Sequence, residues 1–334
     1  MRTSRVSGSH FFAAAWLVLH AFAAGAVSAQ GAATVYPVKP VSLVIPFASG
    51  GTTDTEARLY LQKLQESTGQ PFVFDFRAGG GTTVGSAFVA KAAPDGYTLL
   101  MNNSGITVFP NFYPDLPFDV LKSFAPITAT SDRTTTLVVS TLALPGVKSL
   151  ADLFAHGRAN PGKLNCGTAG SGGVSHIICA SLASAGGIAV TLVHYKGAAQ
   201  GAIDLVAGRT HMNAGAYFNA LPNIKAGKLR AIAVLNADRS KLLPDMPTAI
   251  EQGYDVEYPS WLGVFAPAAT PSAIVNKLHA EFFKAVHAPD VLKQLEAQGS
   301  VALASTPEVF RKRLISELAR WKKIVQDKGI KAEE

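Results

Sequence analysis

Residues 41–54 read VSLVIPFASGGTTD, and this stretch decides the fold. Its first half, 41–47, is a run of β-branched and apolar residues typical of a buried strand. Gly50 and Gly51 then make a turn, and leucines at helical spacing predict a helix over 54–68. A strand, a glycine-rich turn and a helix in this order form the first half of a βαβ unit.

The same alternation continues along the chain and predicts the α/β class with a mainly parallel sheet. The further expected strands cover 72–76, 97–101, 137–140, 163–166, 190–194 and 230–235, and the further expected helices cover 83–92, 149–157, 174–185 and 198–207. Residues 236–260 are loop-rich and contain several prolines. Near the end, Thr270-Pro271 and Thr306-Pro307 each predict an N-cap and the start of a helix, the second of them amphipathic.

The first 29 residues predict an export signal, with Arg2 and Arg5 ahead of a largely apolar run over 11–27. Small residues then favour Ala29 as the last residue removed, so we expect export to the periplasm. An uncleaved membrane anchor is the alternative, but the apolar run is short and no basic stop signal follows it. No cysteine lies near the cleavage site for lipid anchoring. No later segment has eighteen consecutive apolar residues, so we expect a soluble mature chain.

Loss of the two signal arginines lowers the formal net charge from +7 to +5. The surplus is densest at 311–313 and 322–323, which read as a solvated helix face. No basic stripe is interleaved with aromatic residues, so nucleic acid is not expected as a partner. A modest positive field suits an anionic ligand.

The chain has two cysteines, Cys166 and Cys179. A disulfide can form in an exported protein, but a bond from the end of a strand to the second turn of the next helix is geometrically doubtful. We therefore expect two buried thiols, with a disulfide as the alternative. No second pair and no flanking histidine gives metal-ligand spacing, so no metal is expected.

Three glycine-rich turns, 49–54, 79–83 and 170–175, each lie between a predicted strand and a predicted helix. Such a turn presents the free N–H groups of the helix start, and these donors with the helix dipole favour a carboxylate or phosphate. Glycine lets the backbone approach a ligand, although it also simply permits a tight turn. No nucleotide-binding motif is present, so no cofactor is expected.

Catalysis has little support in the sequence. Ser175 and His176 are neighbours on a helix and point in different directions, so they make no nucleophile–base pair. Asp54, at a helix start, is better explained as a cap than as a base. Lys196 is a candidate ligand contact, with a solvated or structural lysine as the alternative, and Arg77 is expected to hold the turn at 79–83.

Several segments together resemble one known family. They are VIPFASGGTTD (44–54), KAAPDGYTLL (91–100), NPGKLN (160–165), YKG (195–197), IKAGKLR (224–230), LPDMPT (243–248) and SWLG (260–263). Over residues 36–330 the chain is similar to the substrate-binding proteins of tripartite tricarboxylate transporters, the Bug family. The resemblance implies an α/β, type II-like, two-domain periplasmic solute-binding protein fold with the ligand cleft between the domains. Residues 36–136 and 262–334 would form domain 1 and residues 137–261 domain 2, with crossings at 135–140 and 260–266.

The resemblance also implies that a ligand carboxylate is held between two turns, mostly by backbone N–H groups and ordered waters. Carried over by position, the predicted ligand contacts are Ser49, Gly50, Gly51, Thr52, Asp54, Ser104, Ala169, Gly170, Ser171, Gly172, Val174, Ser175 and His176.

The sequence departs from the family pattern at Ala48-Ser49, which replaces Pro-Pro or Pro-Gly, and at 76–79, which reads FRAG in place of Asn-Arg-Pro-Gly. At 212–216 the chain reads MNAGA where relatives commonly have a Met-Phe-Asp run, so Gly215 stands at the acidic position. If that acid meets an amino group in relatives, we expect this chain's ligand to lack a cationic amine or to be bulkier.

The predicted function is therefore capture of a small organic acid, without catalytic residues. We expect a monomer that docks on transporter membrane subunits or, alternatively, on the periplasmic domain of a sensor. A periplasmic hydrolase or isomerase using Asp54, His176 or His194 is the remote alternative, and it needs an acid–base pair that the sequence does not supply.

Overall fold

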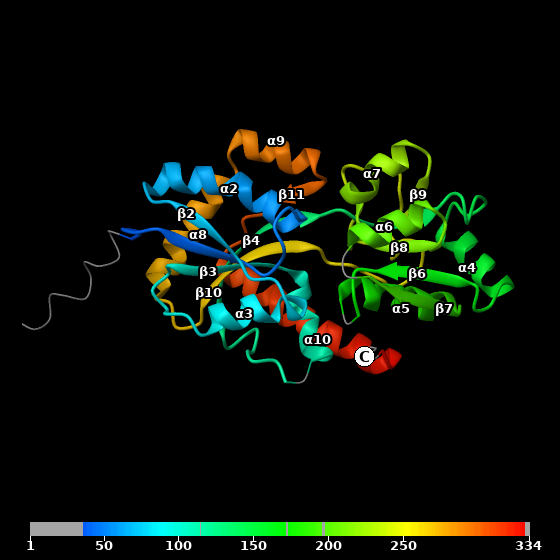
Figure 1. Cartoon of the computed structure of the whole chain (residues 1–334), viewed down its shortest axis with the longest axis horizontal. Helices are drawn as coiled ribbons and strands as arrows, with labels where there is room; N and C mark the ends of the chain where they lie inside the picture. Colours follow the sequence, from blue (N-terminus) through cyan, green and yellow to red (C-terminus); the bar gives the residue numbers. More distant parts are fainter. Residues whose placement is uncertain (1–35, 114, 172, 196–197, 331–334) are drawn as a thin grey trace, which may run out of the picture. The chain divides into compact units, whose positions relative to one another are not determined.

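The computed structural model describes residues 36–113, 115–171, 173–195 and 198–330 (Figure 1). The predicted export signal, 1–29, lies outside these ranges. The described elements form a mixed α/β fold with two sheets, which confirms the predicted α/β class. The prediction of a mainly parallel sheet is wrong, because each sheet combines parallel pairs with antiparallel ones. None of the helices within these ranges combines the length and the apolar character needed to cross a membrane.

The first sheet has the strand order β11-β4-β10-β3-β1-β2. Its strands are β1 (Val41–Ile45), β2 (Phe72–Phe76), β3 (Thr98–Asn103), β4 (Phe124–Arg133), β10 (Trp261–Pro267) and β11 (Ser300–Ala302). β1 pairs in parallel with β2 and β3, whereas β10 runs antiparallel to β3 and β4. The helices that contact this sheet include α2 (Thr52–Thr68), α3 (Thr83–Ala90), α8 (Ser272–Val286) and α9 (Pro289–Ala297).

The second sheet has the order β7-β6-β8-β5-β9. Its strands are β5 (Thr135–Ser140), β6 (Leu164–Thr168), β7 (Val190–His194), β8 (Met212–Ala216) and β9 (Leu229–Val234), and its helices are α4 (Leu150–Ala159), α5 (Val174–Gly186), α6 (Ala198–Val206) and α7 (Tyr217–Lys225). Successive strand residues face opposite sides of a sheet. Accordingly, Leu137 packs in a cluster with α4 and α5, whereas Val138 packs with Leu205 of α6.

The chain crosses from the first sheet to the second at Thr134 and returns through residues 258–260. The two crossings are hydrogen-bonded to one another. The Arg133 N–H donates to the Ser260 carbonyl at 2.8 Å, and Thr135 Oγ1 donates to the Tyr258 carbonyl at 3.0 Å. This sheet membership supports the predicted domain boundaries, which stay a prediction.

The long C-terminal helix α10 (Pro307–Lys328) packs against the cores of both sheets. Phe310 and Leu314 lie in the core cluster of the first sheet, and Trp321 lies in the cluster that includes α5. The predicted amphipathic helix is confirmed. It begins as predicted, because Thr306 Oγ1 accepts the backbone N–H three residues further on at 3.3 Å.

The predicted N-cap at Thr270 is wrong. α8 begins at Ser272 and Pro271 occupies the N-cap position, so the Thr270 hydroxyl lies one residue too early to reach the helix N–H groups. The sequence analysis also did not predict β4, β8, β11, α7 or α9. β4 is rich in Thr and Ser, so its sequence lacks the apolar pattern typical of a buried strand. α7 contains Pro222, which disfavours a helix in isolation.

Candidate functional site

The first glycine-rich turn connects β1 to α2. Gly50 has φ +83°, a left-handed conformation that disfavours side chains. The buried Asp54 carboxylate folds back on this turn, where its Oδ2 accepts the Gly50 N–H at 2.7 Å. Arg58 Nε lies 2.8 Å from the other oxygen, Oδ1. Asp54 therefore caps its own turn, as predicted, while the backbone of Ser49, Gly50 and Gly51 is exposed.

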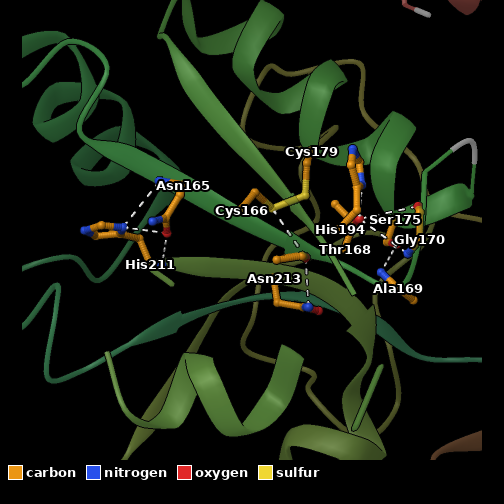
Figure 2. Close-up of a disulfide and its surroundings, with 11 residues drawn as sticks. Asn165, Cys166, Thr168, Ala169, Gly170, Ser175, Cys179, His194, His211 and Asn213 are labelled. Atoms are coloured by element: carbon orange, nitrogen blue, oxygen red, sulfur yellow. Dashed lines mark hydrogen bonds between the residues drawn. A yellow bond between two sulfur atoms is a disulfide. The ribbon is translucent and has the colours of Figure 1, made fainter. Parts of the chain in front are cut away.

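The second predicted contact turn connects β6 to α5. Gly170 has φ +148°, and Ser175 Oγ accepts the Ala169 N–H at 3.0 Å (Figure 2). The Ser175 hydroxyl thus holds the turn. Gly172 lies outside the described residues.

His176 is buried in an aromatic cluster. Its ring lies 6.0 Å from the Phe112 ring and 4.8 Å from the His194 ring, measured between centroids. His194 Nδ1 shares a hydrogen bond of 2.6 Å with the hydroxyl of Thr168, at the end of β6. His194 of β7 therefore holds the residue that precedes the turn, and His176 of α5 packs against His194.

A disulfide joins Cys166 of β6 to Cys179 of α5 (Figure 2). The prediction of two free thiols is wrong. The turn folds α5 back along the strand, so the two Cα atoms lie 6.2 Å apart, within the range that a disulfide spans. Both sulfurs are buried, and the bond closes a loop that contains the whole second turn.

The remaining glycine-rich turn, 79–83, and Ser104 make contacts within the fold. Arg77 Nε donates to Asp75 Oδ2 at 2.8 Å and its guanidinium lies 3.5 Å from the centre of the Phe88 ring, so Arg77 holds this turn as predicted. Ser104 is buried, and its Oγ donates to the Pro259 carbonyl at 2.7 Å, which ties the end of β3 to the returning crossing. The Ser104 hydroxyl therefore already donates its hydrogen bond within the protein.

Tyr195 also has a structural contact, because its hydroxyl donates to Asp204 Oδ2 of α6 at 2.7 Å. Burial, with a smaller effect of Asp204, raises the pKa of Tyr195 to about 12. Lys196, the other candidate after β7, lies outside the described residues.

A cavity of about 220 Å³ lies against the second sheet and the two crossings. This is space for roughly seven waters, which suits a small metabolite. Its lining residues are Asn103, Arg133, Thr136, Val138, Ala169, Ser175, Ala198, Ala202, Leu205, Asn213, Ala214, Gly215, Ala216, Asn219, Ala220, Leu229, Tyr258 and Ser260. Of the predicted contacts that the structure describes, Ala169 and Ser175 alone line it, and those of the first turn do not.

Most of the polar wall of this cavity, including Arg133, Thr136, Asn213 and Tyr258, was not predicted from the sequence. These residues come from β5, β8 and the two crossings; Asn213 lies in the segment 212–216 that departs from the family pattern, and no motif marks the other three. Arg133 offered one signal, since it is a cation at the junction of two buried strands.

Arg133 is the one cationic side chain among the described residues of the lining, which include no carboxylate. Its Nη2 pairs with Glu56 Oε2 of α2 at 3.1 Å, and Glu56 is fully buried. Glu56 Oε1 also accepts hydrogen bonds from Tyr60 at 2.8 Å and Ser131 at 2.5 Å. Because this network fixes Glu56, it also fixes the guanidinium at the cavity.

Burial raises the pKa of Tyr258 to about 12, although the nearby Arg133 opposes the shift. The phenol therefore stays protonated and neutral at physiological pH. Across the described ranges, no group of three or more His, Cys, Asp or Glu side chains has the geometry of a metal site.

The family model described as "Tripartite tricarboxylate transporter family receptor" matches residues 57–330. The chain belongs to this family. Among its relatives, Protein BugT of Bordetella pertussis is 33% identical over 314 residues, covering 92% of this chain and 95% of BugT.

Two solved structures share the fold of this receptor over nearly their whole length. An R. palustris protein solved with adipate is 33% identical, covers 89% of this chain and 99% of its own, and has a TM-score of 0.80. MatC from Rhodopseudomonas palustris, with bound malate, is 31% identical, covers 87% of this chain and 100% of its own, and has a TM-score of 0.77. The family resemblance and the two-domain binding-protein fold predicted from the sequence are confirmed.

Proposed function

We propose that this receptor captures a small carboxylate, free of a cationic amine, in the periplasm and delivers it to the membrane subunits of a tripartite tricarboxylate transporter. The observation that carries the proposal is the charge of the cavity. The cavity is lined by the start of α5, where the helix dipole is positive, and by one arginine. Its described lining residues include no carboxylate. An anion is attracted to such a surface, and an ammonium group finds no counter-ion.

The comparisons support the same class of ligand, because the two related structures hold adipate and malate. The family description names a transporter receptor, which favours transport over a sensing subunit. We further propose that the chain acts as a monomer, with its export signal cleaved after Ala29. Residues 36–136 with 262–334 would form one domain and 137–261 the other.

In this proposal, the second turn and Arg133 bind one carboxylate, and the exposed backbone of Gly51 completes the site from the first turn. Arg133 presents a planar fork of donors, held by Glu56 before the ligand arrives. Such preorganisation reduces the entropy that binding must overcome.

Calorimetric titration with malate and adipate, and with their dimethyl esters, tests this. We expect at least one acid to bind and its ester to bind at least 10-fold more weakly, since the ester lacks the charge. Arg133→Lys keeps the charge but loses the fork, so it should weaken binding. Arg239→Lys, at an exposed ion pair outside the cavity, is the matched control and should not. Equal affinity for acids and esters would overturn the proposal.

A further inference from the structure

One hydroxyl in the cavity wall has no partner among the described residues. Thr136 of β5 lines the cavity and is 1% exposed, and its Oγ1 makes no hydrogen bond with any residue that the structure describes. Its neighbour Thr135 shows the contrast, because that hydroxyl contacts both Asn236 Oδ1 and the Tyr258 carbonyl at 3.0 Å. Buried hydroxyls are nearly always paired, so an unpaired one at a binding cavity indicates a missing partner.

The pairing of β5 with β8 explains why the Thr136 hydroxyl has no partner among the described residues. Thr136 lies directly opposite Gly215 of the antiparallel strand β8. Residues paired in this way face the same side of the sheet, and here the glycine contributes no side chain. A Cβ built on Gly215 would meet only Asn213 Oδ1, at 3.4 Å, so there is space beside the Thr136 hydroxyl.

The surroundings of Thr136 are neutral and largely apolar. Val138, Leu205 and Leu229 line the same cavity, and together they form a small buried cluster on this face of the sheet. The side chain of Asn213 is partly engaged, since its Nδ2 donates to the Gly167 carbonyl at 2.9 Å (Figure 2). A ligand chain that lies along this wall therefore meets apolar surface and one unpaired neutral hydroxyl.

We infer that Thr136 is a specificity-determining ligand contact, and that it selects acids whose carbon chain carries a hydroxyl or keto oxygen over the same acids without that oxygen. The inference rests on the proposed function, because it assumes that the acid occupies this cavity. Thr136 Oγ1 acts as a donor to a keto oxygen and as donor or acceptor to a hydroxyl. A neutral hydrogen bond of this kind corresponds to roughly a 3- to 10-fold preference.

The test compares matched pairs of acids by calorimetry: malate with succinate, and 2-oxoadipate with adipate. In the unmodified protein, we expect at least one oxygen-bearing acid to bind about 3- to 10-fold more tightly than its parent. Thr136→Val is isosteric and should bring that ratio close to 1 while leaving the affinity for the parent acid unchanged. Thr270→Val is the matched control. It removes another buried hydroxyl without a partner among the described residues, but one that does not line the cavity, so the ratio should persist.

Thermal unfolding of the ligand-free variants separates this role from a structural one. If Thr136 is unpaired until ligand arrives, valine should leave the melting temperature equal or higher, whereas loss of a structural hydrogen bond would lower it. A selectivity ratio unchanged in Thr136→Val overturns the inference. Equal binding of both acids in each pair by the unmodified protein also overturns it but leaves the proposed function intact, and binding of none of the four acids counts against the proposed function itself.

Discussion

Reduction of the Cys166–Cys179 bond should lower the free energy of unfolding by about 3 kcal/mol. The two residues are 13 positions apart, and the entropy of closing a loop of about this length in the unfolded chain gives that value at 25 °C. A chain of roughly 300 residues has an unfolding entropy of about 0.6 kcal/mol per kelvin near its midpoint. The melting temperature should therefore fall by about 5 °C if the chain unfolds as one unit.

Both sulfurs are buried, so the reductant must act on the unfolded chain. The protein is unfolded in urea with a phosphine reductant, which supplies the two electrons that, with two protons, convert the bond to two thiols. It is then refolded beside an untreated sample that passes through the same steps, and urea midpoints are compared. The double variant Cys166→Ala/Cys179→Ala is the control, because the reductant should not change its midpoint.

The same samples test what the bond does for the site. The bond closes a loop around the second turn, so its loss should weaken binding of the probe acid as well as the fold. Two observations would refute the reasoning. One is two titratable thiols in the unreduced, urea-unfolded protein; the other is a change of less than about 1 kcal/mol on reduction.

Three further predictions concern stability. Glu56→Ala leaves the Arg133 guanidinium without its carboxylate and should cost about 3–5 kcal/mol in urea unfolding, whereas Glu56→Gln, which keeps the side-chain volume and one acceptor oxygen, should cost less. Burial, with a smaller effect of a neighbouring histidine, lowers the pKa of His211, so the unfolded chain binds a proton more readily than the folded one. Stability should then fall as the pH drops through about 6.5, and this loss should be smaller in His211→Gln, measured by urea midpoints from pH 8 to pH 5. Thr306→Ala removes a helix cap and should cost about 1 kcal/mol, while Thr270→Ala removes no cap and should cost clearly less; equal costs would contradict the assignment.

The elements with strong local signals were predictable from the sequence. β1 and α2 follow from an apolar run, a glycine pair and helical leucine spacing, and α10 follows from its cap and its periodicity. β4 was not predictable, because it buries polar side chains. Its Ser131 hydroxyl donates to Glu56 and its Thr130 hydroxyl to the Leu262 carbonyl, and such long-range pairing leaves no trace in the local sequence.

The site divides in the same way. The two glycine-rich turns could be located, since a strand, glycines and a helix start are local features. The cavity wall could not, because it depends on the register that places Thr136 opposite Gly215, and the two residues are far apart in the chain. The disulfide was not predicted for a related reason. The sequence indicates that Cys166 lies on a strand and Cys179 on a helix, but it does not show how closely the turn brings them together.

The contacts at the site suggest how affinity and selectivity are separated in this receptor. Asp54 and Ser175 each hold a turn, and Glu56 holds the arginine, so these groups are fixed without the ligand. Groups that are already satisfied and rigid recognise the charge that all carboxylates share, and they favour binding by preorganisation. Thr136 differs because its hydrogen bond is left for the ligand. A binding site discriminates most strongly where a buried polar group goes unpaired with the wrong ligand. Selectivity among acids should therefore change most with substitutions at Thr136 and at the position opposite, and overall affinity with substitutions in the turns.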